Sequence, residues 1–198
     1  MAIIRDIVVV GAALGGVTAI AKLAATWPAE LPATVLVALA TPEQPPEMVL
    51  QILKTYAPVA VAYAVHGDTV KSRRIYLSPP GSHMFVGSGG VLYLDKGNAY
   101  DTSRPSINRL FAAAAMVYGP RVIGIVMSGD TKDGAQGMRD IADAGGVGIV
   151  QEPDDATASR MPENVIRNDH PRYIAKAADI AALVKMLMLN GQASDFAG

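Results

Sequence analysis

Two glycine-containing loops hold the residues of this 198-residue chain that could do chemistry. The segment Ser128–Gly134 places Asp130 and Asp133 between a predicted strand and a predicted helix. A carboxylate there can orient a catalytic base, or it can simply cap the following helix. The segment Gly11–Gly16, with the sequence GAALGG, is a turn that directs backbone N–H groups and a helix dipole at a bound ligand. Both loops therefore indicate a catalytic or binding site, with helix capping as the structural alternative for Asp133.

The glycine turn does not match the motifs for dinucleotide or phosphate binding. Gly11 and Gly16 fit the G-x-G-x-x-G pattern, but Ala13 occupies the position of its second glycine. No Gly-Lys-Ser/Thr sequence follows the turn, so the phosphate-loop motif is absent as well. No histidine or further acid lies at ligand spacing from Asp130 and Asp133. We therefore expect no cofactor and no metal.

Apolar β-branched runs alternate along the chain with alanine-rich stretches of helical character, which predicts the elements that position these loops. The predicted strands are 7–10, 34–40, 59–62, 74–77, 84–86, 91–94, 122–127, 147–150 and 172–175, and the predicted helices are 15–26, 46–56, 106–118, 134–144, 162–166 and 178–189. Several strands are continuously apolar, as in a parallel sheet covered on both faces. The prediction is an α/β fold with a doubly wound, mostly parallel sheet flanked by helices and an antiparallel hairpin insertion around Gly87–Gly90.

Composition favours one domain over residues 1–190, with a flexible tail at 191–198. The chain is 51% hydrophobic and 18% charged and has no cysteine, so it can bury a core without disulfides. Its formal net charge of −1 with interspersed signs argues against a nucleic-acid partner. The first apolar run is too short to cross a membrane and follows Asp6, unlike a signal peptide. We expect a cytoplasmic protein without membrane insertion.

Six short motifs occur in a fixed order along the chain. They are Gly11-Ala-x-x-Gly-Gly-Val-x-Ala, Ser78-Pro-Pro-Gly-Ser-His83, Arg104-Pro-Ser-Ile107 with Leu110-Phe111, Ser128-Gly-x-x-x-Asp133-Gly-Ala-x-Gly-Met138, Ala144-Gly-Gly146 with Gln151, and Met161-Pro162. Together they resemble the protein-glutamate methylesterase domain of bacterial chemotaxis, over almost the whole chain from Ile7 to Leu189. The regulatory receiver domain of that family is expected to be missing, because no further acidic α/β domain precedes Ile7.

The resemblance implies hydrolysis of γ-glutamyl methyl esters on chemoreceptors by a Ser-His-Asp triad. The family's serine position falls on Ala13, its histidine position on Ala40 and its acid position on Asp133. A methyl group is no nucleophile and accepts no proton, so we expect the fold without the esterase chemistry. We predict that the three residues cluster at the carboxyl edge of the sheet, where open α/β sheets bind ligands.

A binding or regulatory module is therefore the leading hypothesis, with a chemoreceptor or another signalling protein as the implied partner. Gly15 and Gly16 of the turn, together with His83 and Met161, are expected to contact the ligand. The alternative is an active carboxylic-ester hydrolase, a protein-glutamate methylesterase that uses relocated catalytic residues. Ser128 and Thr41 are the candidates for such a relocation, although Ser128 is expected to serve the backbone of its turn. Engineered alanines in an otherwise active enzyme are a third alternative.

Overall fold

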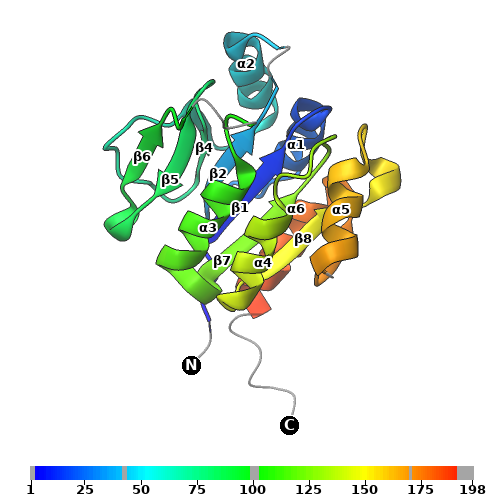
Figure 1. The fold of residues 1–198 in the computed structure, drawn as a ribbon. Coiled ribbons are helices and arrows are strands. Elements are labelled where there is room, and N and C mark those ends of the chain that lie inside the picture. Colours follow the sequence, from blue (N-terminus) through cyan, green and yellow to red (C-terminus); the bar gives the residue numbers. More distant parts are fainter. Residues whose placement is uncertain (1–2, 42–43, 99–102, 170, 191–198) are drawn as a thin grey trace.

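A seven-stranded parallel sheet forms the centre of the molecule (Figure 1). The computed structural model describes residues 3–41, 44–98, 103–169 and 171–190. The strand order is β3-β4-β2-β1-β7-β8-β9, and β5 and β6 form a separate antiparallel pair. The predicted α/β class, with its doubly wound sheet and hairpin insertion, is confirmed.

The elements alternate along the chain much as the sequence predicts. The strands are β1 (Ile7–Ala12), β2 (Thr34–Leu39), β3 (Ala60–Tyr63), β4 (Arg74–Leu77), β5 (His83–Val86), β6 (Leu92–Asp95), β7 (Val122–Val126), β8 (Val147–Gln151) and β9 (Tyr173–Ala175). The α-helices are α1 (Gly16–Ala25), α2 (Pro46–Tyr56), α3 (Ile107–Tyr118), α4 (Ala135–Asp143), α5 (Arg160–Asp169) and α6 (Ala177–Asn190). Short 3₁₀ turns occupy Ser88–Gly90, Gly119–Arg121 and Pro153–Asp155.

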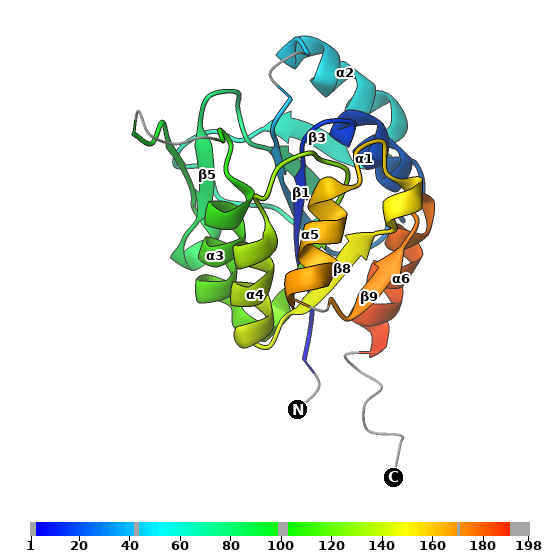
Figure 2. The same ribbon diagram turned by 45° about the vertical axis from the view of Figure 1, so that its right-hand side comes forward.

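Helices cover both faces of the sheet, which explains why β1, β2, β7 and β8 are apolar along their whole length. Helices α1, α2 and α6 pack on one face, and α3, α4 and α5 pack on the other (Figure 2). Every residue of these four strands is buried. Parallel strands joined by helical crossovers bury both of their faces in this way. No helix among the described residues is both long and apolar enough to cross a membrane.

Helix α5 is longer than the short helix predicted at 162–166. It begins at Arg160, and Pro162 lies in its first turn, where a missing backbone N–H costs little. Ser159 just before the helix donates from its hydroxyl to Glu163 at 2.7 Å, and the Glu163 N–H donates to the Ser159 carbonyl at 2.9 Å. The helix therefore begins two residues before the segment predicted from its apolar residues and ends three residues after it. The predicted tail at 191–198 lies outside the described residues.

Candidate functional site

The turn that contains Ala13 lies at the carboxyl end of the central strand β1. The Ala13 N–H donates to the Ser128 carbonyl at 2.9 Å, and the Ala13 carbonyl accepts the Gly16 N–H at 2.7 Å. Ala13 is only 3% exposed, and its methyl carbon lies 3.2 Å from where a Cβ on Gly129 would stand. Backbone contacts therefore join the turn after β1 (residues 11–16) to the loop after β7 (residues 128–134). We call these segments the β1 turn and the β7 loop.

Gly15 and Gly16 are required by the shape of this turn. Gly15 caps α1 in the left-handed region, with φ 75°, where side chains other than glycine are strained. A Cβ on Gly15 would also stand 2.5 Å from Thr157 Cβ and 2.7 Å from Ser128 Oγ. A Cβ on Gly16 would stand 2.7 Å from the side chains of Ala12 and Leu39. Both glycines let the start of α1 pack tightly, which accounts for them without a ligand.

Ala40 lies beside this turn, just past the end of β2. Its N–H donates to the Ala12 carbonyl at 3.0 Å, which continues the parallel register that pairs Ala12 with Leu39. The partly buried Ala40 packs against the same apolar cluster that contains Ala13. Strands β1, β2 and β7 thus bring Ala13, Ala40 and the loop before Asp133 to one edge of the sheet.

Asp133 caps a helix, but not the helix that follows it in the chain. Its Oδ2 accepts the Ile107 N–H at 2.7 Å, and its Oδ1 accepts the Asn108 N–H at 2.9 Å and the Ser106 hydroxyl at 3.3 Å. The N–H of Gly134 adds a contact at 3.1 Å. The sequence-based expectation of a cap on the following helix is therefore corrected: the carboxylate mainly serves the start of α3. A carboxylate can accept about four hydrogen bonds, so these contacts fill the acceptor positions of Asp133.

Asn108 supplies the reciprocal cap, a role that the sequence did not indicate. Its Oδ1 accepts the Gly134 N–H at 3.0 Å and the Gly137 N–H at 2.7 Å, both at the start of α4. The residue preceding α4 is Gly134, which has no side chain to do this. We name this pair of interactions, Asp133 on α3 and Asn108 on α4, the cross-caps. No local signal could have revealed them, because the partners are 25 or more residues apart.

Ser128 serves the backbone of its turn, as the family resemblance implied. It is fully buried; its hydroxyl donates to the Leu14 carbonyl at 2.8 Å and accepts the Ala158 N–H at 2.9 Å. Its own N–H donates to Gln151 Oε1 at 2.9 Å. The Ser128 oxygen thus joins the β1 turn to the segment before α5, and neither contact is to a base that could activate it as a nucleophile.

His83 and Met161, predicted as ligand contacts, both lie in the interior with no exposed surface. The His83 Nδ1 accepts the Ser106 N–H at 3.1 Å, so the imidazole joins β5 to the start of α3. Met161 packs below the β7 loop, where its sulfur accepts the Thr131 hydroxyl at 3.4 Å. Their ligand contacts stay predictions, and from these positions any influence on a ligand would pass through the loops that they support.

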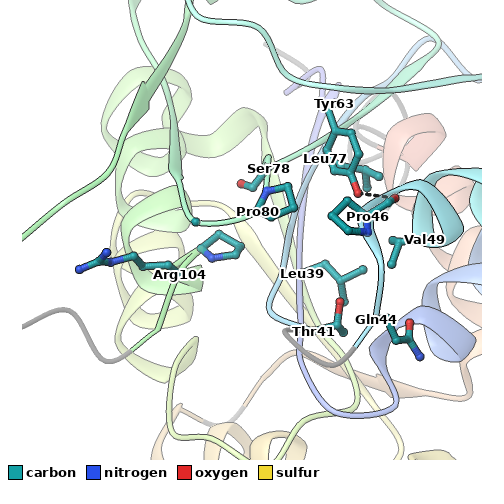
Figure 3. A pocket seen from close by; sticks show the side chains of 12 residues that line it. Leu39, Thr41, Gln44, Pro46, Val49, Tyr63, Leu77, Ser78, Pro80 and Arg104 are labelled. Carbon is teal, nitrogen blue, oxygen red and sulfur yellow. Dashed lines mark hydrogen bonds between the residues drawn. The ribbon is translucent and has the colours of Figure 1, made fainter. Parts of the chain in front are cut away.

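Two hollows flank this edge of the sheet. One, of about 460 Å³, is lined by Asp133 and by Ser103, Ser106, Asn108, Arg109, Thr131 and Lys132. The other, of about 320 Å³, is lined by Leu39 and Thr41 on either side of Ala40 in the sequence, and by residues of α2, β3 and the loops after β4 and before α3 (Figure 3). Across the described residues, no group of three or more His, Cys, Asp or Glu side chains could hold a metal ion.

Many hydrolases and binding proteins share this architecture, a doubly wound α/β domain in which a glycine turn and an acidic loop meet at the ends of neighbouring strands. Residues 8–184 match the family model described as CheB methylesterase, and the chain belongs to this family. The crystal structure of the Thermotoga maritima CheB methylesterase catalytic domain superposes with a TM-score of 0.86 at 26% identity, covering 93% of this chain and 98% of that one.

Relatives from other organisms differ in how much of them this chain covers. A Leptospira interrogans protein is 28% identical over 178 residues, which are 90% of this chain and 92% of that protein. The protein-glutamate methylesterase/protein-glutamine glutaminase 2 of Anaeromyxobacter dehalogenans is 36% identical over 154 residues, 78% of this chain but 44% of the relative. The protein-glutamate methylesterase FrzG of Myxococcus xanthus is 31% identical over 81% of this chain and 48% of its own length. The chain thus spans about half of the length of several relatives.

Proposed function

We propose that this protein is a methylesterase-like module that does not hydrolyse esters and instead binds a partner or ligand at the carboxyl edge of its sheet. The observation that carries the proposal is Ala13: a methyl group stands in an otherwise well-formed turn at the position that the family resemblance assigns to the nucleophile. Ala40, at the position assigned to the histidine, supplies no imidazole to accept a proton. The same proposal places the protein in the cytoplasm.

The retained acid does not weaken this proposal. Asp133 accepts hydrogen bonds from three backbone N–H groups and one hydroxyl, so its structural role suffices to keep it in the chain. A relocated nucleophile has less support than a lost one, because the Ser128 hydroxyl is buried and engaged by backbone groups. We infer that the partner is a chemoreceptor or another signalling protein, in line with the names that the relatives carry.

The test is an esterase assay with methylated receptor fragments and a generic ester. Loss of one triad member costs about 10⁴–10⁶ in turnover and loss of a second adds little, so we expect no turnover by the unmodified protein. Multiple turnovers that Ser128→Ala or Thr41→Ala abolishes would establish the alternative, an active hydrolase with relocated residues.

The double variant Ala13→Ser/Ala40→His restores the serine and histidine positions of the triad, so the same assay can test for a gain of activity. The glycine turn is in place, but Asp133 would have to give up one of its present hydrogen bonds to orient the new imidazole. The two substitutions together should still gain more activity than the sum of the single variants, because triad residues act as a unit. We expect a small gain, because a misplacement of about 1 Å can cost roughly 100-fold. A double variant no better than either single one would indicate a site that has diverged beyond simple repair.

A further inference from the structure

The hollow of about 320 Å³ beside Ala40 has the features of a small-molecule site in its own right. We call it the β2–β4 cavity, because Leu39 ends β2 and Leu77 ends β4, and both line it. Its volume falls at the lower end of the range of about 300–1,000 Å³ for ligand pockets. Its position beyond the carboxyl ends of parallel strands is where open α/β sheets bind ligands.

The walls of the β2–β4 cavity are mainly hydrocarbon. The apolar side chains that line it come from Leu39, Pro46, Val49, Leu77, Pro80 and Pro105. The Tyr63 hydroxyl at the wall is already used, because it donates to the Pro46 carbonyl at 2.8 Å and holds the start of α2 against β3 (Figure 3). An occupant would therefore gain free energy mainly by burying an apolar body.

Two polar atoms in the same lining have no hydrogen-bond partner among the described residues. Ser78 is 5% exposed, and its Oγ is buried with no hydrogen-bond partner within the described part of the chain. The Oε1 atom of Gln44 is also buried and has no hydrogen-bond partner among the described residues. Buried polar groups are nearly always hydrogen-bonded, so two such atoms in the lining of one cavity indicate an occupant that can hydrogen-bond.

Charge in the lining limits the kind of occupant. Among the lining residues that the structure describes, only Arg104 is charged, and its side chain extends away from the others in Figure 3. Its guanidinium donates to the Asn98 carbonyl. An ionised ligand would lose its hydration without gaining a counter-charge, which is costly.

We propose that the β2–β4 cavity binds a small uncharged molecule with a short apolar body and one hydrogen-bonding head, such as an alcohol or an amide. The apolar walls take the body, and the Ser78 hydroxyl or the Gln44 amide meets the head. The cavity lies beside Ala40 at the same edge of the sheet as the turn at Ala13. Binding in the cavity does not depend on whether that turn hydrolyses esters.

The test uses isovaleramide as the probe and isovalerate, its charged counterpart of nearly the same shape, as the matched control at neutral pH. Binding is followed by the methyl NMR resonances of Leu39, Val49 and Leu77 in the full chain. A probe this small is expected to bind in the millimolar range. Saturable shifts with the amide, and binding of the acid that is at least about tenfold weaker, would support the proposal.

The variants Ser78→Ala and Gln44→Leu distinguish a specific binding site from an apolar cavity that binds small molecules nonspecifically. Loss of one hydrogen bond should weaken amide binding about two- to tenfold in at least one of these variants. Ser78→Ala should not lower the melting temperature, because the hydroxyl has no hydrogen-bond partner among the residues that the structure describes. Thr55→Ala, on the exposed part of α2, is the control for a lost hydroxyl.

Three results would overturn the proposal. One is the absence of saturable shifts, which would mean that water alone fills the cavity. Another is equal binding of amide and acid. The third is amide binding that neither Ser78→Ala nor Gln44→Leu weakens. None of these results depends on the esterase assay, so failure of this proposal and failure of the proposed function are distinguishable.

Discussion

At the scale of single residues, the most constrained position near the candidate site is Gly15. Its backbone is left-handed, and its missing side chain leaves room for Thr157 and for the Ser128 hydroxyl, which ties three loops together. Asp133 is constrained in another way, because backbone N–H groups of α3 surround its carboxylate. Neither residue needs a catalytic role to explain its presence.

Gly15→Ala tests this constraint, with Gly67→Ala as its matched control. Gly67 also has a positive φ, 87°, but a Cβ there would meet nothing within 4 Å. The control should cost about 1 kcal/mol of unfolding free energy from backbone strain alone. Gly15→Ala should cost about 3 kcal/mol, because overpacking adds to the strain. Urea denaturation measures both, and equal losses would contradict the packing of this turn.

At the scale of elements, α3 and α4 hold each other's first turns through the cross-caps. The acid before α4 serves α3, and the amide in the first turn of α3 serves α4. Each helix start thereby depends on the placement of the other, which fixes the loop between β7 and α4 at the edge of the sheet. The start of α6 depends on a similar acceptor, Asp155.

Asn108→Ala should remove two hydrogen bonds at the start of α4 and lower the unfolding free energy by about 1–2 kcal/mol. Asn108→Asp keeps an acceptor oxygen at this place but puts a second carboxylate on the Gly134 N–H beside Asp133. It should therefore be compared at high salt, where the repulsion is screened and its loss should be smaller than that of Asn108→Ala. Chemical denaturation of both variants is the measurement. If Asn108→Asp were as unstable as Asn108→Ala, acceptance by Oδ1 would not be the stabilising interaction.

Asp155 should make the stability of the protein depend on pH in the acidic range. Burial raises the pKa of its carboxyl. The Ala177 N–H, the Gln151 amide and the positive charges of Lys22 and Lys176 together lower this pKa by more, so the net shift is downward. Because the folded pKa lies below the ordinary value of about 3.9, the stabilisation is complete above that value and is lost as pH falls below it.

The comparison for this pH effect is Asp155→Asn against the unmodified protein, with the exposed neighbour Asp154→Asn as the charge control. We expect Asp155→Asn to melt at a lower temperature at neutral pH, and the difference to shrink as pH falls below about 4. Melting curves from pH 7 to about 3 measure it. A difference that stays constant with pH would exclude the ionised carboxylate as the cause.

At the scale of the whole molecule, one sheet separates two apolar layers. Trp27, the chain's single tryptophan, is buried in the layer of α1, α2 and α6. Phe111 is fully buried in the layer of α3, α4 and α5, where a Cβ on Gly137 would stand 2.6 Å from its Cβ. The predicted single domain over residues 1–190 requires these layers to unfold together.

Phe111→Ala tests this cooperativity, because it opens a cavity in one layer while Trp27 fluorescence reports on the other. The loss of unfolding free energy should be about 3–5 kcal/mol. We expect the Trp27 fluorescence and far-UV circular dichroism transitions to shift by the same amount, as in a two-state transition. A Trp27 midpoint that does not move would mean that the two layers unfold independently.

The fold class and the approximate bounds of most elements could be predicted from the amino-acid sequence. The sequence also predicts that Ala13, Ala40 and Asp133 cluster at the carboxyl edge of the sheet, and this stays a prediction. These features follow from patterns within short windows: continuous apolar runs, alanine-rich helical stretches and glycines between them. Chemistry could also be anticipated from residue types, because no arrangement in space gives alanine a hydroxyl or an imidazole. The backbone role of Ser128 was expected from the family resemblance rather than from a local pattern.

The strand order, the helix that Asp133 caps and the burial of His83 and Met161 depend on long-range packing and could not be predicted from the sequence. Long-range packing also forms the β2–β4 cavity, whose lining residues come from segments as far apart as Leu39 and Pro105. These features depend on which surfaces pack together after the chain has folded. A hydrogen bond between Asn108 and Gly137 stabilises the fold only when two helices distant in sequence are side by side, and no local pattern encodes that pairing.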